Sequence, residues 1–433
     1  MGKVAGRILG MLAVPCVVCA TAVAVGAAAH PAHSGRVRKT TAAVAKTAAA
    51  TTAAPTPPMG FDAWDQDYCN VTQADILSNA KALVSSGLAA DGYDYVILDD
   101  CWMAENRSAS GELQARKAAF PNGIAWLAKQ VHALGLKIGI YESAGKRTCE
   151  NRPGSFGHYA KDARTFARWG INYVKFDSCH MPKGVSQASL FRQFGADLRA
   201  DNPAIVYSEE LPVHAATNPA SGTFTRFVSV SSQIANLWRV TPDEQSNALA
   251  STTLIRALDT DLALGGYAGP DHWNDLDLLL TGNTKYNWSK PHQESQLSIW
   301  AEMSSPLIVS ANLADAGEVA HLASRASGSG SLLANKAVIA VDQDPVQGKS
   351  VGSYGVMKVV VKPMAGGAHA VLVANTAHVP RSVTVPLKVM GIAAGSDWQA
   401  LWSKQQFVAT KSVTVTLRGG GTVLYEVTPA KAS

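Results

Sequence analysis

The sequence predicts an α/β protein, a (β/α)8 TIM barrel followed by a C-terminal antiparallel β-sandwich domain. Between Thr56 and about residue 345, short β-rich runs alternate with amphipathic segments, a pattern typical of parallel strands joined by helical crossovers. No GxGxxG motif follows the first strand, which argues against an open doubly wound sheet, the second choice for this pattern. From about Gly348 the chain changes to alternating runs between Gly-rich turns, which predicts antiparallel strands.

Six barrel strands are indicated directly, and two are inferred from the eightfold closure. The β-rich runs are 95–98, 137–141, 173–176, 204–207, 227–230 and 307–310. The inferred strands follow Gly60 and lie near 262–266. Between the runs, apolar residues recur at helical spacing, as at Leu127, Val131 and Leu134. The strands of the second domain are expected at 357–361, 370–374, 382–385 and 413–417.

The composition sets the broad class of protein. The 433 residues are 47% hydrophobic and 16% charged, which predicts a globular protein with two domains. The net charge of +5 is small for this length, and several basic residues lie in the first 46 positions. Nucleic acid is therefore not an expected partner.

The N-terminus has the pattern of a secretory signal. Lys3 and Arg7 precede an apolar stretch from about residue 8 to 29, the order of a signal peptide. An uncleaved membrane anchor is the alternative, because the stretch approaches spanning length. The predicted organisation is a signal peptide at 1–29, a flexible Ala/Thr-rich leader at 30–54, the barrel at 55–345 and the β domain at 346–433. We expect a secreted protein with no membrane attachment after cleavage.

Four cysteines follow the expected signal, namely Cys69, Cys101, Cys149 and Cys179. An even number in an exported chain predicts two disulfides, and four cysteines allow three pairings. We favour Cys69–Cys101 and Cys149–Cys179, because each pair would join loops that follow neighbouring strands. A zinc site is the alternative, but these four cysteines have neither CxxC spacing nor a nearby His pair to support it.

Polar residues follow the predicted barrel strands, at the end where active sites of this fold lie. The β-rich run at 173–176 contains Lys175 and is followed by Asp177, and the run at 95–98 is likewise followed by Asp99 and Asp100. For either motif alone, an Asp that caps the next helix is an equally good explanation. Carboxylates outnumber bases at these positions, which favours glycoside hydrolysis by two carboxyl groups. A divalent cation is the competing use of clustered acids, but Lys175 and Arg239 would weaken it. Neither a metal nor a cofactor is expected.

Nine motifs occur in order along the chain. They are TPPMG at 56–60 with Trp64, LDDCW at 98–102, FPNG at 120–123, GLKIGIY at 135–141, PGS at 153–155, WG at 169–170, KFD at 175–177, WNDLD at 273–277 and DQDP at 342–345. Together they resemble glycoside hydrolase family 27, which includes α-galactosidases and α-N-acetylgalactosaminidases. The resemblance runs from Thr56 to about the end of the chain, and it implies a catalytic (β/α) barrel with a C-terminal antiparallel β domain.

The resemblance also implies a retaining double displacement. Asp177 matches the nucleophile and Asp243 matches the general acid/base, and retention requires their carboxyl groups to lie about 5 Å apart. Lys175 favours the ionised form of Asp177, whereas Asp243 has to start protonated. Without the motif, Asp243 would be read as the first acidic residue of a helix.

Further positions match sugar-binding residues of the family. Asp99 and Asp100 match the pair that binds the hydroxyls at O4 and O6. Trp64 and Trp102 would form the pocket wall, unless they are core residues. The complete expected set of substrate-binding residues is Trp64, Asp99, Asp100, Tyr141, Lys175, Glu210, Trp238, Arg239 and Asp277.

The segment 207–214 resembles the loop that sorts substrates at C2 of the sugar. Glu210 with Val213 fits members that act on galactose, and an acetamido group should clash there. The chain departs from the family pattern at Glu142, where a small residue is usual, and at Glu209 and Ala235, where some relatives carry a disulfide. These departures leave subsite details and leaving-group preference open.

The sequence thus predicts a secreted exo-glycosidase that removes terminal α-D-galactosyl residues from oligosaccharides or polysaccharides. A β-L-arabinopyranosidase is the alternative within the family, and Asp99, which suits an O6 hydroxyl, favours galactose. A galactose-binding protein without turnover is the alternative from a different class. The presence of both Asp177 and Asp243 argues against it.

Overall fold

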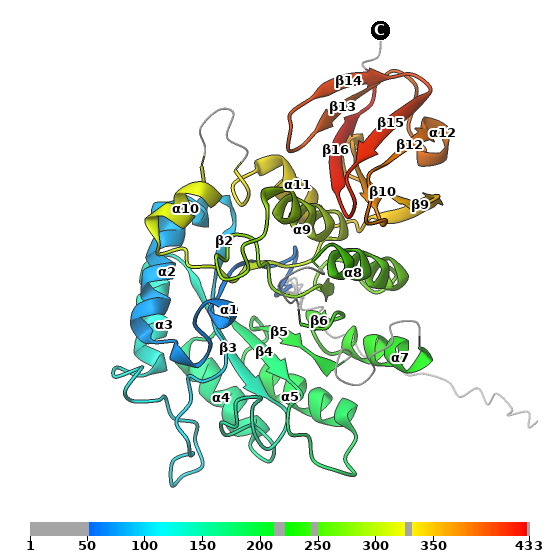
Figure 1. Cartoon of the computed structure of the whole chain (residues 1–433). Helices are drawn as coiled ribbons and strands as arrows, with labels where there is room; N and C mark the ends of the chain where they lie inside the picture. The colour runs from blue at the N-terminus through cyan, green and yellow to red at the C-terminus, as the bar shows by residue number, and fades with distance from the viewer. Residues whose placement is uncertain (1–51, 212–220, 244–249, 325–330, 431–433) are drawn as a thin grey trace, which may run out of the picture. The chain divides into compact units, whose positions relative to one another are not determined.

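The computed structural model describes residues 52–211, 221–243, 250–324 and 331–430 (Figure 1). The expected signal peptide, most of the expected leader and Val213 lie outside these residues. Ala54, which the sequence assigned to the leader, is buried, and its carbonyl accepts a 2.9 Å hydrogen bond from the Trp273 indole. The described part of the chain contains no helix with both the length and the apolar character needed to cross a membrane.

Eight parallel strands form one sheet in the order β7-β6-β5-β4-β3-β2-β1-β8. The sheet closes where Leu279, just past β7, forms a parallel bridge to Val309 of β8. The Leu279 N–H donates to the Ile308 carbonyl at 2.7 Å. This closure confirms the predicted TIM barrel. The strands are β1 Met59–Asp62, β2 Tyr93–Leu98, β3 Lys137–Ser143, β4 Tyr173–Asp177, β5 Val206–Glu209, β6 Leu237–Arg239, β7 Trp273–Asp275 and β8 Leu307–Val309.

Two of the predicted strands are wrong. Residues 227–230 lie in helix α7 (Gly222–Ser231), where the Ser221 hydroxyl caps the N-terminus and Phe224, Val228 and Ser231 are buried at helical spacing. Residues 262–264 end helix α8 (Ala250–Leu264). The true strands β6 and β7 are three residues each, too short for a recognisable alternating pattern.

Helices lie between the strands and cover the outside of the barrel (Figure 1). Along β4, successive side chains point alternately toward the surrounding helices and toward the barrel interior. Val174 and Phe176 belong to the core shared with the helices, and the Phe176 ring stacks on Phe194 of α5 with ring centroids 3.8 Å apart. Tyr173 belongs to the cluster inside the barrel. The other helices are α1 Trp64–Asp67, α2 Gln73–Ser85, α3 Ile124–Ala133, α4 Tyr159–Trp169, α5 Gln187–Asp201, α9 Lys290–Met303, α10 Ala316–Leu322 and α11 Lys336–Gln343.

The C-terminal part is an antiparallel β-sandwich. A six-stranded sheet in the order β14-β13-β16-β11-β10-β9 packs against the two-stranded sheet β12-β15. Val359 and Val371 of the larger sheet share a core with Val385 and Val413 of the smaller one. The strands are β9 Lys349–Tyr354, β10 Met357–Pro363, β11 His369–Asn375, β12 Arg381–Pro386, β13 Ser396–Ala400, β14 Gln406–Ala409, β15 Ser412–Leu417 and β16 Thr422–Thr428, and the short helix α12 is Leu387–Met390.

The other face of the large sheet packs on barrel helices. Val360 and Leu372 belong to the same core as α9 residues. Lys362 of β10 is fully buried, and its ammonium group donates to the Ser304 hydroxyl at 2.6 Å and to the Val341 carbonyl at 2.5 Å. A buried lysine thus links the sandwich to the ends of α9 and α11.

Candidate active site

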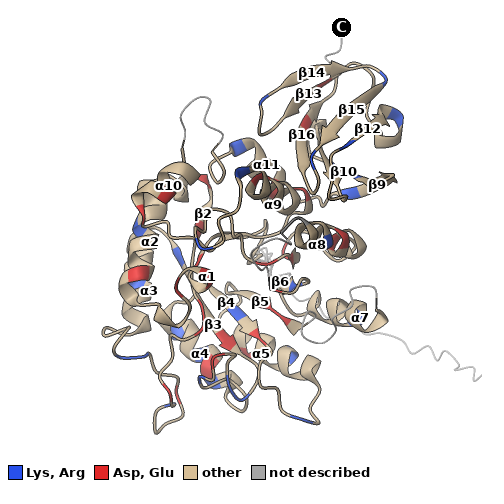
Figure 2. Ribbon diagram, viewed as in Figure 1, with Lys and Arg blue, Asp and Glu red and all other residues tan. Residues whose placement is uncertain are grey.

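A cavity lies at the C-terminal ends of the barrel strands, with about 520 Å³ of empty space including its open mouth. Its wall carries seven carboxyl groups and two cations. The lining residues are Trp64, Asp65, Asp99, Asp100, Tyr141, Cys149, Lys175, Asp177, Glu210, Arg239, Asp243, Asp277 and Leu278. A cavity wall rich in carboxyl groups suits a neutral ligand that offers many hydroxyl donors. Figure 2 shows further acidic residues on barrel strands such as β3 and β5.

The barrel strands place these side chains. Tyr173, Lys175 and Asp177 occupy alternate positions on β4, so all three face inward, and Asp177 stands at the rim. Most of the other lining residues lie in or just after strands in the same way. Trp64 follows β1, Asp99 follows β2, and Glu210 follows β5. Because parallel strands end at one rim, residues far apart in the sequence meet around a single cavity.

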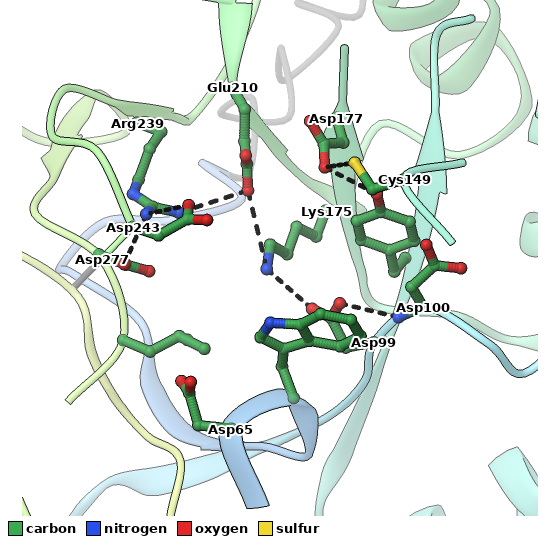
Figure 3. A pocket seen from close by; sticks show the side chains of 13 residues that line it. Asp65, Asp99, Asp100, Cys149, Lys175, Asp177, Glu210, Arg239, Asp243 and Asp277 are labelled. Carbon is green, nitrogen blue, oxygen red and sulfur yellow. Dashed lines mark hydrogen bonds and ion pairs between the residues drawn. The ribbon is translucent and has the colours of Figure 1, made fainter. Parts of the chain in front are cut away.

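Asp177 is held by two donors (Figure 3). The Tyr141 hydroxyl donates to Asp177 Oδ2 at 2.7 Å, and the Ser178 N–H donates to Oδ1 at 2.6 Å. The Cys149 sulfur lies 2.9 Å from Oδ2. Burial, and next the charge of Asp177, raise the pKa of Tyr141, so the tyrosine stays protonated and keeps its donor. The carboxylate is fixed in one orientation before any ligand enters.

Lys175 and Arg239 connect the acidic groups of the wall (Figure 3). Lys175 Nζ lies 2.8 Å from Asp99 Oδ2 and 3.7 Å from Glu210 Oε1. Arg239 reaches Glu210 at 3.5 Å, Asp243 at 3.0 Å and Asp277 at 2.5 Å. Burial alone would lower the pKa of both cations, but the neighbouring carboxylates raise it above the ordinary value. Both therefore remain charged and keep the acidic wall in place.

Asp99 and Asp100 differ in their surroundings. Asp99 pairs with Lys175 and accepts the Asp100 N–H at 2.7 Å. Asp100 accepts backbone N–H groups from Cys101 and Glu150 at 2.6 and 3.0 Å. Burial raises the pKa of Asp100 to about 6, against the effect of these donors. Asp100 can therefore act as a donor or an acceptor around pH 6.

Three described acids pair with Arg239, and Asp243 is the most exposed of them. Its side chain is 76% exposed, whereas that of Arg239 is 4% exposed. It lines the same cavity as Asp177, and Figure 3 shows the two carboxyl groups on different sides of it. Solvent and the outer part of a bound substrate can therefore reach Asp243.

Both predicted disulfides, Cys69–Cys101 and Cys149–Cys179, are present in the structure. The second one brings Cys149 to the cavity wall beside Asp177. Among the described residues, the two groups with metal-ligand spacing are Cys69, Cys101 and Glu150, and Cys149, Asp177 and Cys179. Each contains both sulfurs of a disulfide, which are not thiolates and do not suit a metal ion.

Two tryptophans expected at the pocket lie elsewhere. Trp238 is fully buried and outside the cavity lining, and its indole donates to Asn274 Oδ1 at 2.7 Å. Its neighbours on β6, Leu237 and Arg239, face inward, so strand alternation turns Trp238 toward the helices. Trp102 is also fully buried and donates to the Tyr141 carbonyl at 2.9 Å. It supports β3 from outside the lining.

The other expected substrate-binding residues all line the cavity, and three further residues join them. Asp65 and Leu278 directly follow Trp64 and Asp277, so proximity to a motif was the available signal. Cys149 reaches the wall through its disulfide with Cys179, two residues past Asp177. No pattern in the sequence around Cys149 shows that it would lie there.

Comparison with known proteins agrees with this architecture. The family model described as alpha galactosidase A matches residues 56–344, and the model of the alpha galactosidase C-terminal beta sandwich domain matches 354–427. The α-galactosidase of Cyamopsis tetragonoloba is 33% identical over 386 residues, 86% of each chain. Human α-galactosidase A is 34% identical over 352 residues, 78% of each chain.

A solved structure is similar along nearly its whole length. The crystal structure of α-galactosidase I from Mortierella vinacea has a TM-score of 0.75 and 26% identity, covering 89% of this chain and 99% of that one. One family model thus matches the barrel, which carries the acidic cavity, and the other matches the sandwich. The chain is a glycoside hydrolase and belongs to the α-galactosidase (melibiase) family, glycoside hydrolase family 27.

Proposed function

We propose that this protein hydrolyses terminal α-D-galactosyl residues with retention of anomeric configuration. The observation that carries the proposal is that Asp177 and Asp243 line one cavity together with the sugar-binding set around Lys175 and Arg239. The relatives reported above are α-galactosidases, which supports galactose as the sugar. Galactose-terminated oligosaccharides or polysaccharides are the substrate class.

In the first step, Asp177 attacks the anomeric carbon and forms a covalent glycosyl ester, while the protonated Asp243 gives its proton to the departing oxygen. The Tyr141 and Ser178 donors hold the carboxylate of Asp177 in the attacking orientation. In the second step, Asp243 accepts a proton from water, and the resulting nucleophile breaks the ester. The exposure of Asp243 gives that water access.

Glu210 supports discrimination at C2 of the sugar. Its carboxylate is buried between Lys175 at 3.7 Å and Arg239 at 3.5 Å. Two cations hold it in place, so it cannot easily swing aside for a bulky acetamido group. We therefore expect N-acetylgalactosaminides to be poor substrates. Comparable turnover of the two nitrophenyl glycosides would overturn this assignment.

A panel of nitrophenyl glycosides tests the function directly. The panel contains α-D-galactoside, α-N-acetylgalactosaminide, β-L-arabinopyranoside and α-glucoside, and NMR follows the first anomer released. We expect the galactoside to be fastest and α-galactose to appear first. Preferred hydrolysis of the arabinopyranoside would favour the alternative activity, and β-galactose as the first product would contradict retention.

Two variants assign the catalytic roles. Asp177→Ala should lose at least about 10³-fold in kcat, with galactose still bound. Asp243→Ala should keep some turnover of a nitrophenyl substrate, whose leaving group needs little protonation, and azide should restore turnover by forming α-galactosyl azide. Wild-type protein that binds galactose but never releases nitrophenol would instead be a sugar-binding protein.

Secretion is the remaining part of the proposal, and it rests on the signal-like sequence at 1–29. Expression of the full chain should deliver the protein to the medium, with a new N-terminus after the apolar stretch. Retention of the intact N-terminus in the membrane fraction would support an uncleaved anchor.

A further inference from the structure

Asp65 is a carboxyl group of the cavity wall that the double displacement does not use. It is the second residue of α1, directly after Trp64, and it is 8% exposed. Figure 3 shows it on the side of the cavity opposite to Asp177. It therefore lies away from the carboxyl group that would attack the anomeric carbon.

The position of Asp65 is fixed by segments from the other end of the barrel sequence. The Tyr286 hydroxyl donates to Asp65 Oδ1 at 2.7 Å. The Asp65 N–H donates to the Ser310 hydroxyl at 2.9 Å, and the Lys285 ammonium donates to the Asp65 carbonyl at 3.1 Å. Both the backbone and one carboxyl oxygen are thus held before a ligand arrives, which lowers the cost of binding one.

The charge of Asp65 interacts with the groups across the cavity. Burial raises its pKa, the Tyr286 hydrogen bond and the charges of Lys175 and Arg239 lower it, and Asp99 raises it. Lys175, Arg239 and Asp99 belong to the same cavity wall. Among the described residues, no hydrogen bond reaches Asp65 Oδ2. This oxygen is the acceptor that remains for a ligand.

We propose that Asp65 is a further sugar-binding residue, whose carboxylate accepts a hydrogen bond from a hydroxyl group on the part of the galactosyl ring remote from the anomeric carbon. Tyr286 is its positioning residue. The inference rests on the proposed function, because that function places the anomeric carbon at Asp177. The candidate hydroxyls are those at C3, C4 and C6, since the ring has to lie between Asp177 and Asp65.

Calorimetric binding of free sugars tests the inference without requiring turnover. The ligands are D-galactose and its 3-deoxy, 4-deoxy and 6-deoxy forms, and the proteins are wild type and Asp65→Asn. The amide keeps an oxygen that can accept from Tyr286, but it replaces the other oxygen with a donor. We expect the variant to bind galactose about tenfold more weakly. For the one analogue that lacks the partner hydroxyl, wild type and variant should bind equally.

A second variant and a control separate binding from structure. Tyr286→Phe keeps the Asp65 carboxylate but removes the hydroxyl that positions it, so we expect a smaller loss of about threefold with the same dependence on one hydroxyl. Asp67→Asn changes the last residue of the same helix, outside the cavity lining, and should keep galactose affinity within about twofold. Thermal melts of each variant show that it is folded.

The outcomes distinguish this inference from the proposed function. If wild type neither binds galactose nor cleaves the aryl galactoside, both fail. If wild type cleaves the galactoside but Asp65→Asn binds galactose as well as wild type does, only the inference fails. An equal loss for all four sugars would show a structural role for Asp65 and would also overturn it.

Discussion

Arg107 carries a prediction about stability that follows from its hydrogen bonds. Its guanidinium group donates to Asp162 at 2.7 and 2.6 Å, to the Gly111 carbonyl at 3.0 Å and to the Gly154 carbonyl at 2.9 Å. Asp162, on α4, is fully buried. Arg107 therefore joins the loops after β2 and β3 and neutralises a buried carboxylate between them.

Arg107→Met keeps the length of the side chain but removes the charge and the donors. Removing one partner of a buried ion pair lowers the free energy of unfolding by about 3 to 5 kcal/mol. The Ser155 hydroxyl still donates to Asp162 at 2.7 Å, which limits the loss. For the folded unit Ala50–Ser433, about 2 cal/mol/K per residue gives an unfolding entropy near 0.8 kcal/mol/K. The Tm should fall by about 4 to 6 °C.

Thermal melts of four proteins check this reasoning. Arg107→Lys should fall between wild type and Arg107→Met, because an ammonium group keeps the charge but not the two-pronged contact. Adding Asp162→Asn to Arg107→Met should recover at least half of the loss, since a neutral amide costs less to bury. The reasoning is refuted if Arg107→Met melts within about 1 °C of wild type, or if the double variant is no more stable than the single one.

Three further predictions follow from the site and the domain contacts. Tyr141→Phe removes the 2.7 Å hydrogen bond to Asp177, so kcat/KM for the aryl α-galactoside should fall about 10- to 100-fold at unchanged Tm; undiminished kcat/KM would contradict this. Replacing both Cys149 and Cys179 by Ser opens a link across 30 residues and should cost about 3 to 4 kcal/mol in urea unfolding, and a midpoint equal to that of wild type would argue against it. Burial raises the pKa of Glu302 from 4.5 to about 8. Between these two pH values the folded state keeps a proton that the unfolded chain has released. Because the folded state binds more protons, the free energy of unfolding falls as pH rises toward 8. The Tm of Glu302→Gln should therefore gain on wild type between pH 5 and pH 8, and a constant difference would show that Glu302 does not titrate in this way.

The sequence alone determined the fold class and most of the acidic rim of the cavity. Asp99, Lys175 and Asp177 were recognisable because each follows or ends a run of β-rich residues, and the ends of parallel strands converge. That inference needs only local residue patterns and one rule of topology. The disulfide pairs followed from the same rule, since neighbouring strands bring their loops together.

The tertiary structure decided the features that depend on partners distant in sequence. Strands β6 and β7 have three residues each, and their neighbours in the sheet, not their own patterns, make them strands. Trp238 faces the helices because the register of β6 turns Arg239 inward. Asp65 belongs to the cavity because Tyr286, 221 residues later, holds it there. Local patterns fix the period of a segment, but only closure of the barrel sets which remote side chains share a wall.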